Sequence, residues 1–226
     1  DSETQWSRLA ARYLRKEFAL TKEVKRATVH IAGMGLYELF INGQRIGEQV
    51  LAPAPTDYRK TILYNTYDVT PQLQKENAIG VILGNGRFYT MRQNYKPYKI
   101  PTFGYPKLRL NLIVEYTDGS RQTIASDISW KLTTEGPIRS NNEYDGEEYD
   151  ARKELGDWNR TGYDDTNWIP AGRVSIPSGT LRAQMMPGMK VTESLKPVSI
   201  RKQGDKQILR TLRMLLRMFI FFGLMQ

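Results

Sequence analysis

The chain has 226 residues, of which 40% are hydrophobic and 11% aromatic, so it can build a packed core and is not a disordered protein. It has no cysteine and one histidine, His30, which excludes disulfides, thiolate nucleophiles, cysteine-ligated zinc and most histidine-dependent catalysis. Much of the net charge of +9 comes from residues 201–226, which hold six Lys/Arg and one acid. No Lys/Arg block with interleaved aromatic residues stands out before them, so nucleic-acid binding is not expected.

Most of the chain is predicted to form short β-strands separated by turns. The alternating or continuously apolar stretches are, in chain order, "VKRATVHIAG", "LYELFING", "KTILYNTYDVT", "NAIGVILGNG", "KLRLNLIVEYTDGSRQTIASD", "SWKLTTEGPI" and "LRAQMMPGMKVTESLKPVSI". Asn42-Gly43 and Asp118-Gly119 are typical of turns between paired strands. Helical periodicity is weak except for one turn near "DVTPQLQK". These features predict an all-β fold, an antiparallel β-sandwich or jelly roll, with His30 as an ordinary strand residue.

The composition changes after Trp168, where "IPAGRVSIPSG" is rich in Pro, Gly and Ser and is typical of a linker. We therefore expect the sandwich to occupy residues 1–169. Residues 170–206 are then expected to hold the linker and the first strands of a second β-domain.

A second change follows Lys206, where an apolar tail over residues 207–226 fits no preceding β pattern. The tail has 20 residues and contains Arg210, Arg213 and Arg217, so it is not expected to span a membrane. The abrupt change favours a frameshift in the coding sequence after Lys206. The alternative is an amphipathic membrane-surface helix, because the three arginines fall on one helical face.

A set of motifs in one fixed order suggests a family. They are "ARYLRKEF", "GLYELFINGQRIG", "PTDYRKTILYNTYDVT", "NAIGVILGNGRF", "FGYPKLRLNLIVEYTDGS", "YDGEEYDAR", "WKLTTEGPI" and "LRAQMMP...VTESLKPVSI". Over about residues 10 to 206 the chain closely resembles the N-terminal β-domain of bacterial α-L-rhamnosidases, glycoside hydrolase family 78.

The resemblance implies a galactose-binding-like β-sandwich. In the family it is followed by a second β-domain and by an (α/α)6 barrel that carries the catalytic acids. The expected function is a non-catalytic, carbohydrate-binding-like module of an enzyme that removes terminal α-L-rhamnose by inversion. The alternative is a purely structural domain that braces the barrel. The expected partners are a rhamnose-containing carbohydrate and the catalytic domain, and the expected location is periplasmic or extracellular, with a leader that is not in this chain.

The acidic stretch "NNEYDGEEYDAR" allows three interpretations. Inverting glycosidases need two carboxyl groups about 6.5–9.5 Å apart. Glu148 and Asp150 on one strand face would be about 7 Å apart. Neighbours on one strand cannot flank a sugar, however, so we expect no catalytic residue here. A calcium loop is the second interpretation, and the favoured one is a hydrogen-bonded corner of Tyr144, Asp145 and Arg152.

The resemblance also implies a sugar site, because some relatives of this domain bind rhamnose with calcium. The candidate loops are "APTDYRK", "GNGRFY" and "RQNYKPYKIPTFGY". The expected carbohydrate-binding residues are Asp57, Tyr58, Asn85, Arg87, Phe88 and Tyr95, with Asp57 and Asn85 as possible calcium ligands. Tyr58, Phe88 or Tyr95 would stack on the sugar, and Arg87 stands where many relatives have Trp. The alternative is that Asn85 and Asp57 only shape turns.

The four tryptophans are expected to pack in the core or at its edge, because each adjoins a predicted strand end or turn. They are Trp6, Trp130, Trp158 and Trp168. The stretch "DWNRTGYDDTNW", which includes two of them, is expected to form a loop that closes one end of the sandwich.

Overall fold

The structure is a computed structural model that describes residues 9–89, 103–142, 146–175, 177–204 and 206–210. The chain divides into two compact units, Asp1–Met189 and Lys190–Gln226. Apart from two short 3-10 helices, η1 (Thr70–Gln72) and η2 (Ala151–Lys153), the regular structure in the described ranges is all β. The predicted all-β class is confirmed.

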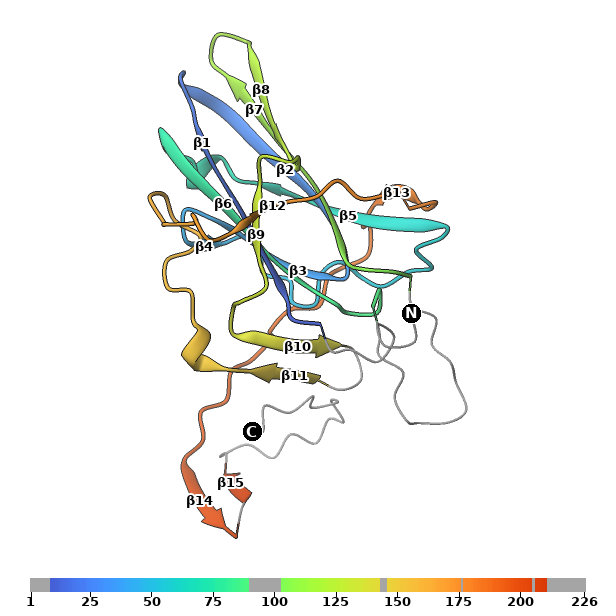
Figure 1. Cartoon of the computed structure of the whole chain (residues 1–226), viewed down its shortest axis with the longest axis vertical. Helices are drawn as coiled ribbons and strands as arrows, with labels where there is room; N and C mark the ends of the chain where they lie inside the picture. Colours follow the sequence, from blue (N-terminus) through green and yellow to red (C-terminus); the bar gives the residue numbers. More distant parts are fainter. Residues whose placement is uncertain (1–8, 90–102, 143–145, 176, 205, 211–226) are drawn as a thin grey trace. The chain divides into compact units, whose positions relative to one another are not determined.

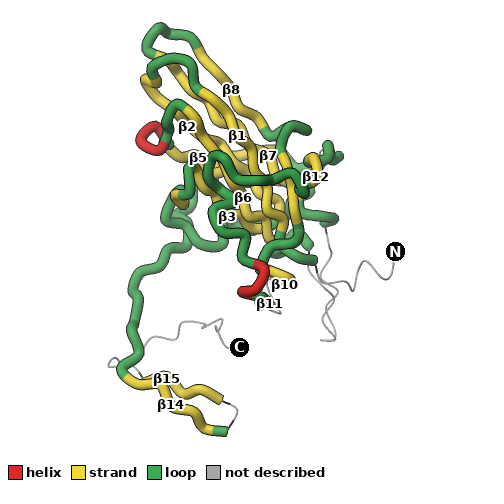
Figure 2. The backbone as a smooth tube through the Cα atoms, turned by 60° about the vertical axis from the view of Figure 1, so that its left-hand side comes forward, coloured by secondary structure: helices red, strands yellow, loops and turns green. Residues whose placement is uncertain are grey.

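Two sheets form the body of the first unit (Figures 1 and 2). The six-stranded sheet has the order β12 (Ile169–Pro170), β9 (Lys131–Thr133), β1 (Arg12–Ala19), β6 (Glu76–Gly84), β3 (Leu36–Ile41) and β4 (Gln44–Arg45). The five-stranded sheet has the order β13 (Thr180–Ala183), β5 (Thr61–Asp68), β2 (Val24–Met34), β7 (Lys107–Tyr116) and β8 (Arg121–Ala125). All pairs are antiparallel except β13 with β5, which is parallel.

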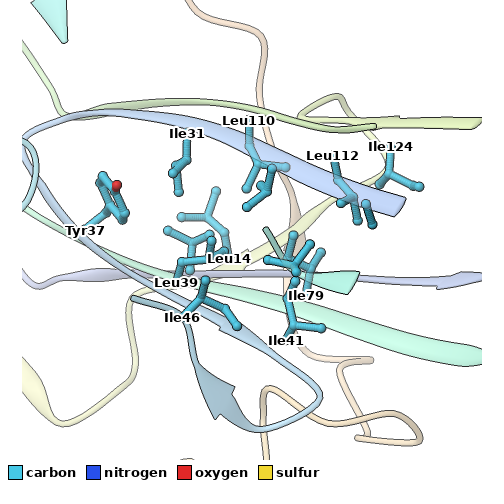
Figure 3. Packing of buried hydrophobic residues seen from close by; sticks show 14 of the residues in the cluster. Leu14, Ile31, Tyr37, Leu39, Ile41, Ile46, Ile79, Leu110, Leu112 and Ile124 are labelled. Atoms are coloured by element: carbon cyan, nitrogen blue, oxygen red, sulfur yellow. The ribbon is translucent and has the colours of Figure 1, made fainter. Parts of the chain in front are cut away.

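The core lies between the inner faces of these sheets. Strand alternation produces it: along β7, Leu110, Leu112 and Val114 are buried while the residues between them are less so. Figure 3 shows side chains of one sheet, such as Ile31 and Leu110, facing Leu39 and Ile79 of the other. Burial of these apolar side chains is the main source of the sandwich's stability.

The predicted turns are present. Asn42 and Gly43 both have positive φ, 52° and 82°, as a tight hairpin between β3 and β4 requires. Gly119, with φ of 83°, closes the β7–β8 hairpin, and η1 is the predicted helical turn. His30 lies on β2, where its Nδ1 is 2.9 Å from Thr66 Oγ1, as expected of a strand histidine.

The expected closing loop packs on the six-stranded sheet. Trp158 and Trp168 are buried with their rings 6.2 Å apart, and Trp130 is buried in the main core. The guanidinium of Arg15 holds the loop, donating to the carbonyl oxygens of Trp158 (2.9 Å) and Arg160 (3.0 Å). Trp6 lies outside the described residues.

The stretch that follows Trp168 takes part in both sheets of the first unit. Strand β12 pairs with β9, and β13 pairs with residues 61–64 of β5, so the backbone ladders continue beyond residue 169. This compact unit extends to Met189.

The second unit contains β14 (Ser199–Gln203) and β15 (Lys206–Arg210), which form an antiparallel hairpin. Residues 207–210 of the apolar tail therefore lie in a strand, and Arg210 is its last residue. The positions of Arg213 and Arg217, on which the helical alternative rests, lie outside the described residues. The helices of the described chain include none with the length and hydropathy of a membrane span.

Candidate functional site

Asp57 shapes a turn in the loop before β5. Its backbone oxygen accepts hydrogen bonds from the amides of Lys60 (2.8 Å) and Thr61 (2.9 Å). Its carboxylate accepts from the backbone and the side chain of Arg59, with Nε 3.0 Å from Oδ1. The Arg59 hydrogen bond lowers the pKa of Asp57. The carboxylate is therefore charged at neutral pH and already paired.

Tyr58 and Phe88 belong to a buried aromatic cluster. Only 3% of Tyr58 and 1% of Phe88 is exposed, and their ring centroids are 5.0 Å apart in an edge-to-face arrangement. Phe103 completes the cluster at 5.1 Å from Tyr58. Neither of the two predicted stacking residues presents a ring face to a ligand in this structure, because both rings are buried. Tyr95, the third, lies outside the described residues.

Asn85 is the centre of a hydrogen-bond network that ties three segments together. Only 2% of it is exposed. Its Oδ1 accepts from Arg12 Nη1 (2.6 Å), and its Nδ2 donates to the carbonyl oxygens of Leu9 (2.8 Å) and Asn141 (2.9 Å). The adjacent Gly86 has a φ of 50°, so the "GNG" stretch is the expected tight turn. The network fastens the end of β6 to the start of β1 and to β10 (Ile138–Asn142).

The two expected calcium ligands do not fit a cation. Asp57 Oδ1 and Asn85 Oδ1 each accept from an arginine, Arg59 and Arg12 respectively. Calcium needs six to eight oxygen ligands, and a neighbouring guanidinium opposes a cation electrostatically. Among the described residues, moreover, no three His, Asp or Glu side chains are grouped as a metal site would require.

An exposed aromatic ring does lie beside this network, on Tyr105. The ring of Tyr105 stacks on Tyr89 with centroids 5.6 Å apart and planes 12° apart, and 51% of Tyr105 is exposed. Tyr89 is held in place because its amide donates to the Asn85 carbonyl (3.2 Å). Burial lowers the pKa of Arg12, and the nearby hydroxyls of Tyr89 and Tyr105 oppose this change. Arg12 and Tyr89 are both hydrogen-bonded to Asn85, which joins them in one network.

We call Arg12, Asn85, Tyr89 and Tyr105 the Tyr105 site. It combines one accessible ring face, a guanidinium and two phenol hydroxyl groups. Arg87, half-buried in the chain between Asn85 and Tyr89, is close to it in sequence. Protein sites for small ligands commonly pair an aromatic surface with a few fixed polar groups. A sugar, with an apolar C–H face and hydroxyls at its edge, suits such a site.

The acidic stretch forms a hairpin of β10 and β11 (Gly146–Tyr149), seen below the two sheets in Figure 1. A hydrogen bond from Arg152 lowers the pKa of Asp150 to about 2. Partial shielding from water, together with Glu38, raises the pKa of Glu147 although its residue is mostly exposed. In a catalytic acid and base, the surroundings commonly shift the two pKa values in opposite directions, as they do for Glu147 and Asp150. These acids lie on one exposed hairpin, however, and cannot flank a sugar.

The favoured corner is present in part, because Arg152 pairs with Asp150 at 2.8 Å. Asp150 also caps η2 by accepting from the Arg152 amide. Tyr144 and Asp145, the other expected members of the corner, lie outside the described residues.

Comparison with known proteins decides the family. Residues 22–193, more than half of the chain, match the family described as "Alpha-L-rhamnosidase N-terminal domain". The chain belongs to this family. It is 42% identical over 201 residues to an α-L-rhamnosidase of Formosa agariphila and 36% identical over 221 residues to one of Streptomyces avermitilis. These matches cover 87% and 90% of the chain but only 21% of each relative, so the chain spans about a fifth of the length of these curated relatives.

Solved structures agree with this family. The α-L-rhamnosidase of Aspergillus terreus matches with a TM-score of 0.81 and 36% identity, over 90% of this chain and 24% of its own. The Streptomyces avermitilis enzyme, solved in complex with L-rhamnose, matches with a TM-score of 0.73 and 34% identity, over 86% of this chain and 19% of its own. The predicted β-sandwich of a rhamnosidase N-terminal domain is therefore confirmed.

Sequence reasoning missed three residues of the Tyr105 site in this rhamnosidase N-terminal domain. Tyr89 and Tyr105 fall inside the candidate loops, but nothing in the pattern distinguishes them from Tyr58 and Phe88. Arg12 was missed because it is 73 residues away from Asn85. One signal was available: Tyr105 lies between Gly104 and a proline, where a chain turns at the surface.

Proposed function

We propose that this rhamnosidase N-terminal domain is a non-catalytic carbohydrate-binding module that takes a rhamnose-containing saccharide at the Tyr105 site. The observation that carries the proposal is the exposed Tyr105 ring, stacked on Tyr89, whose amide is bonded to the same Asn85 that holds the Arg12 guanidinium. The intact enzyme would hydrolyse terminal α-L-rhamnose with acids supplied by another domain.

Each group has a role in the proposed binding. The Tyr105 ring would stack on the C–H face of the sugar, and Tyr89 would fix the plane of that ring. Arg12 would donate to ring-edge hydroxyls, with its own orientation set by Asn85. One short site of this kind gives weak binding, with a free energy of about −4 to −6 kcal/mol.

A second role is supported by a different surface of the first unit. Leu51, Met185, Met186 and Met189 are all more than half exposed, and the Val50 amide donates to the Met189 carbonyl (2.9 Å), which joins the two segments. An apolar surface of this kind is typical of a protein interface. We propose it as the face that would brace another domain of the intact enzyme. A domain with this role alone would bind no sugar.

Calorimetric titration of the full chain with methyl α-L-rhamnoside tests the binding role. We expect a Kd in the millimolar to high-micromolar range, and no detectable heat with the Tyr105→Ala variant, because the stacking surface is lost. Tyr149→Ala is the matched control, since Tyr149 is exposed to a similar extent (53%) on β11. Equal binding by wild type and Tyr105→Ala would contradict the proposed site.

A further inference from the structure

The Tyr105 site holds cations, and the hairpin that carries Glu147 and Glu148 is joined to the same network through Asn141. Arg12 and Arg87 lie within or beside the site, and the charge of Arg59 is offset by Asp57. The sequence around them shows the same bias: residues 87–107 contain five Lys/Arg and no Asp or Glu. Residues 90–102 of that stretch lie outside the described residues and are not part of the site.

Arg12 is the cation that suggests an anionic ligand, because its partner within the described chain is not an acid. Its Nη1 donates to an amide oxygen, that of Asn85, at 2.6 Å. By contrast, Arg15 on the same strand is paired with two carboxylates, those of Glu17 and Asp165. A partly buried guanidinium remains charged at every physiological pH and is most stable when an anion completes its hydrogen bonds.

The surrounding groups suit an anion as well. The phenol hydroxyl of the exposed Tyr105 can donate a hydrogen bond. The side-chain nitrogen of Asn141, whose Oδ1 accepts from the Asn85 amide (2.6 Å), is buried and has no hydrogen-bond partner in the described part of the chain. A carboxylate or a sulfate group offers several acceptor oxygens to donors arranged in this way.

We propose that the Tyr105 site recognises an anionic saccharide, with one sugar ring stacked on Tyr105 and a carboxylate or sulfate group of the same saccharide paired with Arg12. This inference rests on the proposed carbohydrate-binding function and adds the charge of the ligand. In a rhamnose-containing glycan, the anionic unit would be a neighbour of the rhamnose. The domain would then direct the enzyme to acidic polysaccharides.

Sugars that differ mainly in charge test whether the site prefers an anionic ligand. Methyl β-D-glucuronide and methyl β-D-glucoside differ by a carboxylate in place of a hydroxymethyl group, and glucose 6-sulfate carries the alternative anion. Titrated calorimetrically into the full chain at low salt, the glucuronide or the sulfate is expected to bind about tenfold more tightly than the glucoside, which is the effect of one charge-assisted hydrogen bond. The tighter of the two identifies the anionic group.

Two variants test whether Arg12 causes the preference for anionic sugars. Arg12→Gln can still donate to Asn85 but lacks the charge, so the anionic and neutral probes should bind it equally. Arg121→Gln is the control, because Arg121 is exposed on β8 and pairs with Glu115. It should keep the full preference. Circular dichroism of each variant shows whether the sandwich has formed, and Arg12→Met, which also lacks the charge, serves if the Gln variant does not fold.

Equal affinity for the three probes in the wild type would overturn the proposal, as would a preference that persists in Arg12→Gln. A single-stranded oligonucleotide that displaces the glucuronide at equal charge concentration would also overturn it, in favour of a nucleic-acid surface. In each case methyl α-L-rhamnoside reports separately on the proposed function: rhamnoside binding that needs Tyr105 without any preference for anions would leave that function intact.

Discussion

Arg15 shows how one buried residue fastens a loop. Only 2% of this side chain is exposed, and it pairs with Glu17 and Asp165 while donating to two carbonyl oxygens of the closing loop. Removing one partner of a buried ion pair is costly because the remaining charge is left without compensation. Lys131, which also pairs with Asp165 at 2.6 Å, reduces that cost.

We therefore predict that Arg15→Met lowers the free energy of unfolding by about 3 kcal/mol, the lower end of the range for such pairs. Urea denaturation measures it. Arg121→Met removes an exposed pair with Glu115 and should cost less than about 1 kcal/mol. If both variants lost the same stability, the ion pairs of Arg15 would not hold the loop.

A substitution of Asp57 tests whether the sugar binds in the loop before β5. Its carboxylate is occupied by Arg59, so we predict that Asp57→Ala leaves the affinity for methyl α-L-rhamnoside unchanged. Calorimetry on this variant and on Tyr105→Ala compares the two positions directly. A loss of binding with Asp57→Ala alone would move the site to the loop before β5.

At the scale of elements, Gly80 governs how the closing loop rests on β6. A Cβ at this position would be 2.7 Å from Trp158 Cζ3 and 2.9 Å from Asn159 Cβ. We predict that Gly80→Ala displaces the loop and costs about 1–3 kcal/mol of stability. Gly172→Ala is the control, because a Cβ there would meet nothing within 4 Å. Thermal unfolding monitored by tryptophan fluorescence distinguishes the two, and equal midpoints would contradict the packing described.

The strands that sequence predicts well are those with their own alternation or apolar run, such as β2, β6 and β7. Their periodicity is local and survives folding. Strand β13 is different: residues 180–183 become part of a sheet only by pairing with residues 61–64, more than a hundred positions earlier. No local pattern encodes such a partner, so this predicted strand was expected in a second β-domain and not in the sandwich.

At the scale of the whole molecule, buried tyrosines limit the stability of the folded state at alkaline pH. Burial raises the pKa of Tyr13 from 10.0 to about 12, and it also raises the pKa values of Tyr37 and Tyr67. A raised tyrosine pKa means that the folded state holds the proton more tightly than the unfolded state does. The stabilisation that these buried tyrosines contribute is therefore fully present below pH 10.0 and is lost as the pH rises towards 12.

We predict that the urea midpoint is constant from neutral pH to about pH 9 and declines steeply above pH 10. Phenolate absorbance should show that part of the tyrosines ionises only on unfolding. A midpoint that is flat to pH 12 would mean that these rings are not buried as described.

The acidic hairpin leads to a prediction about catalysis. Its carboxyl groups lie on one exposed β-hairpin, so the chain should not release the aryl group from an aryl α-L-rhamnoside. A colorimetric assay with purified protein is sufficient. Turnover that disappears in Glu148→Gln would contradict the non-catalytic role.

Sequence alone located the site less well than the fold. Its candidate loops include residues of the proposed Tyr105 site, but the rings that it chose for stacking, Tyr58 and Phe88, are buried, and they cannot be distinguished from Tyr105 before their burial is known. It also passed over the basic and aromatic character of residues 87–107. The partnership of Arg12 and Asn85 depends on the adjacency of β1 and β6, which only the assembled sheet provides.

The central proposal is sugar binding at the Tyr105 site, and the most direct measurement is an amide-resolved NMR titration of the full chain with methyl α-L-rhamnoside. We predict saturable shifts that centre on Arg12, Asn85, Tyr89 and Tyr105 and that are absent in Tyr105→Ala. The absence of any saturable shift in the wild type, or shifts that centre on Glu147 and Asp150 in the acidic hairpin, would contradict it.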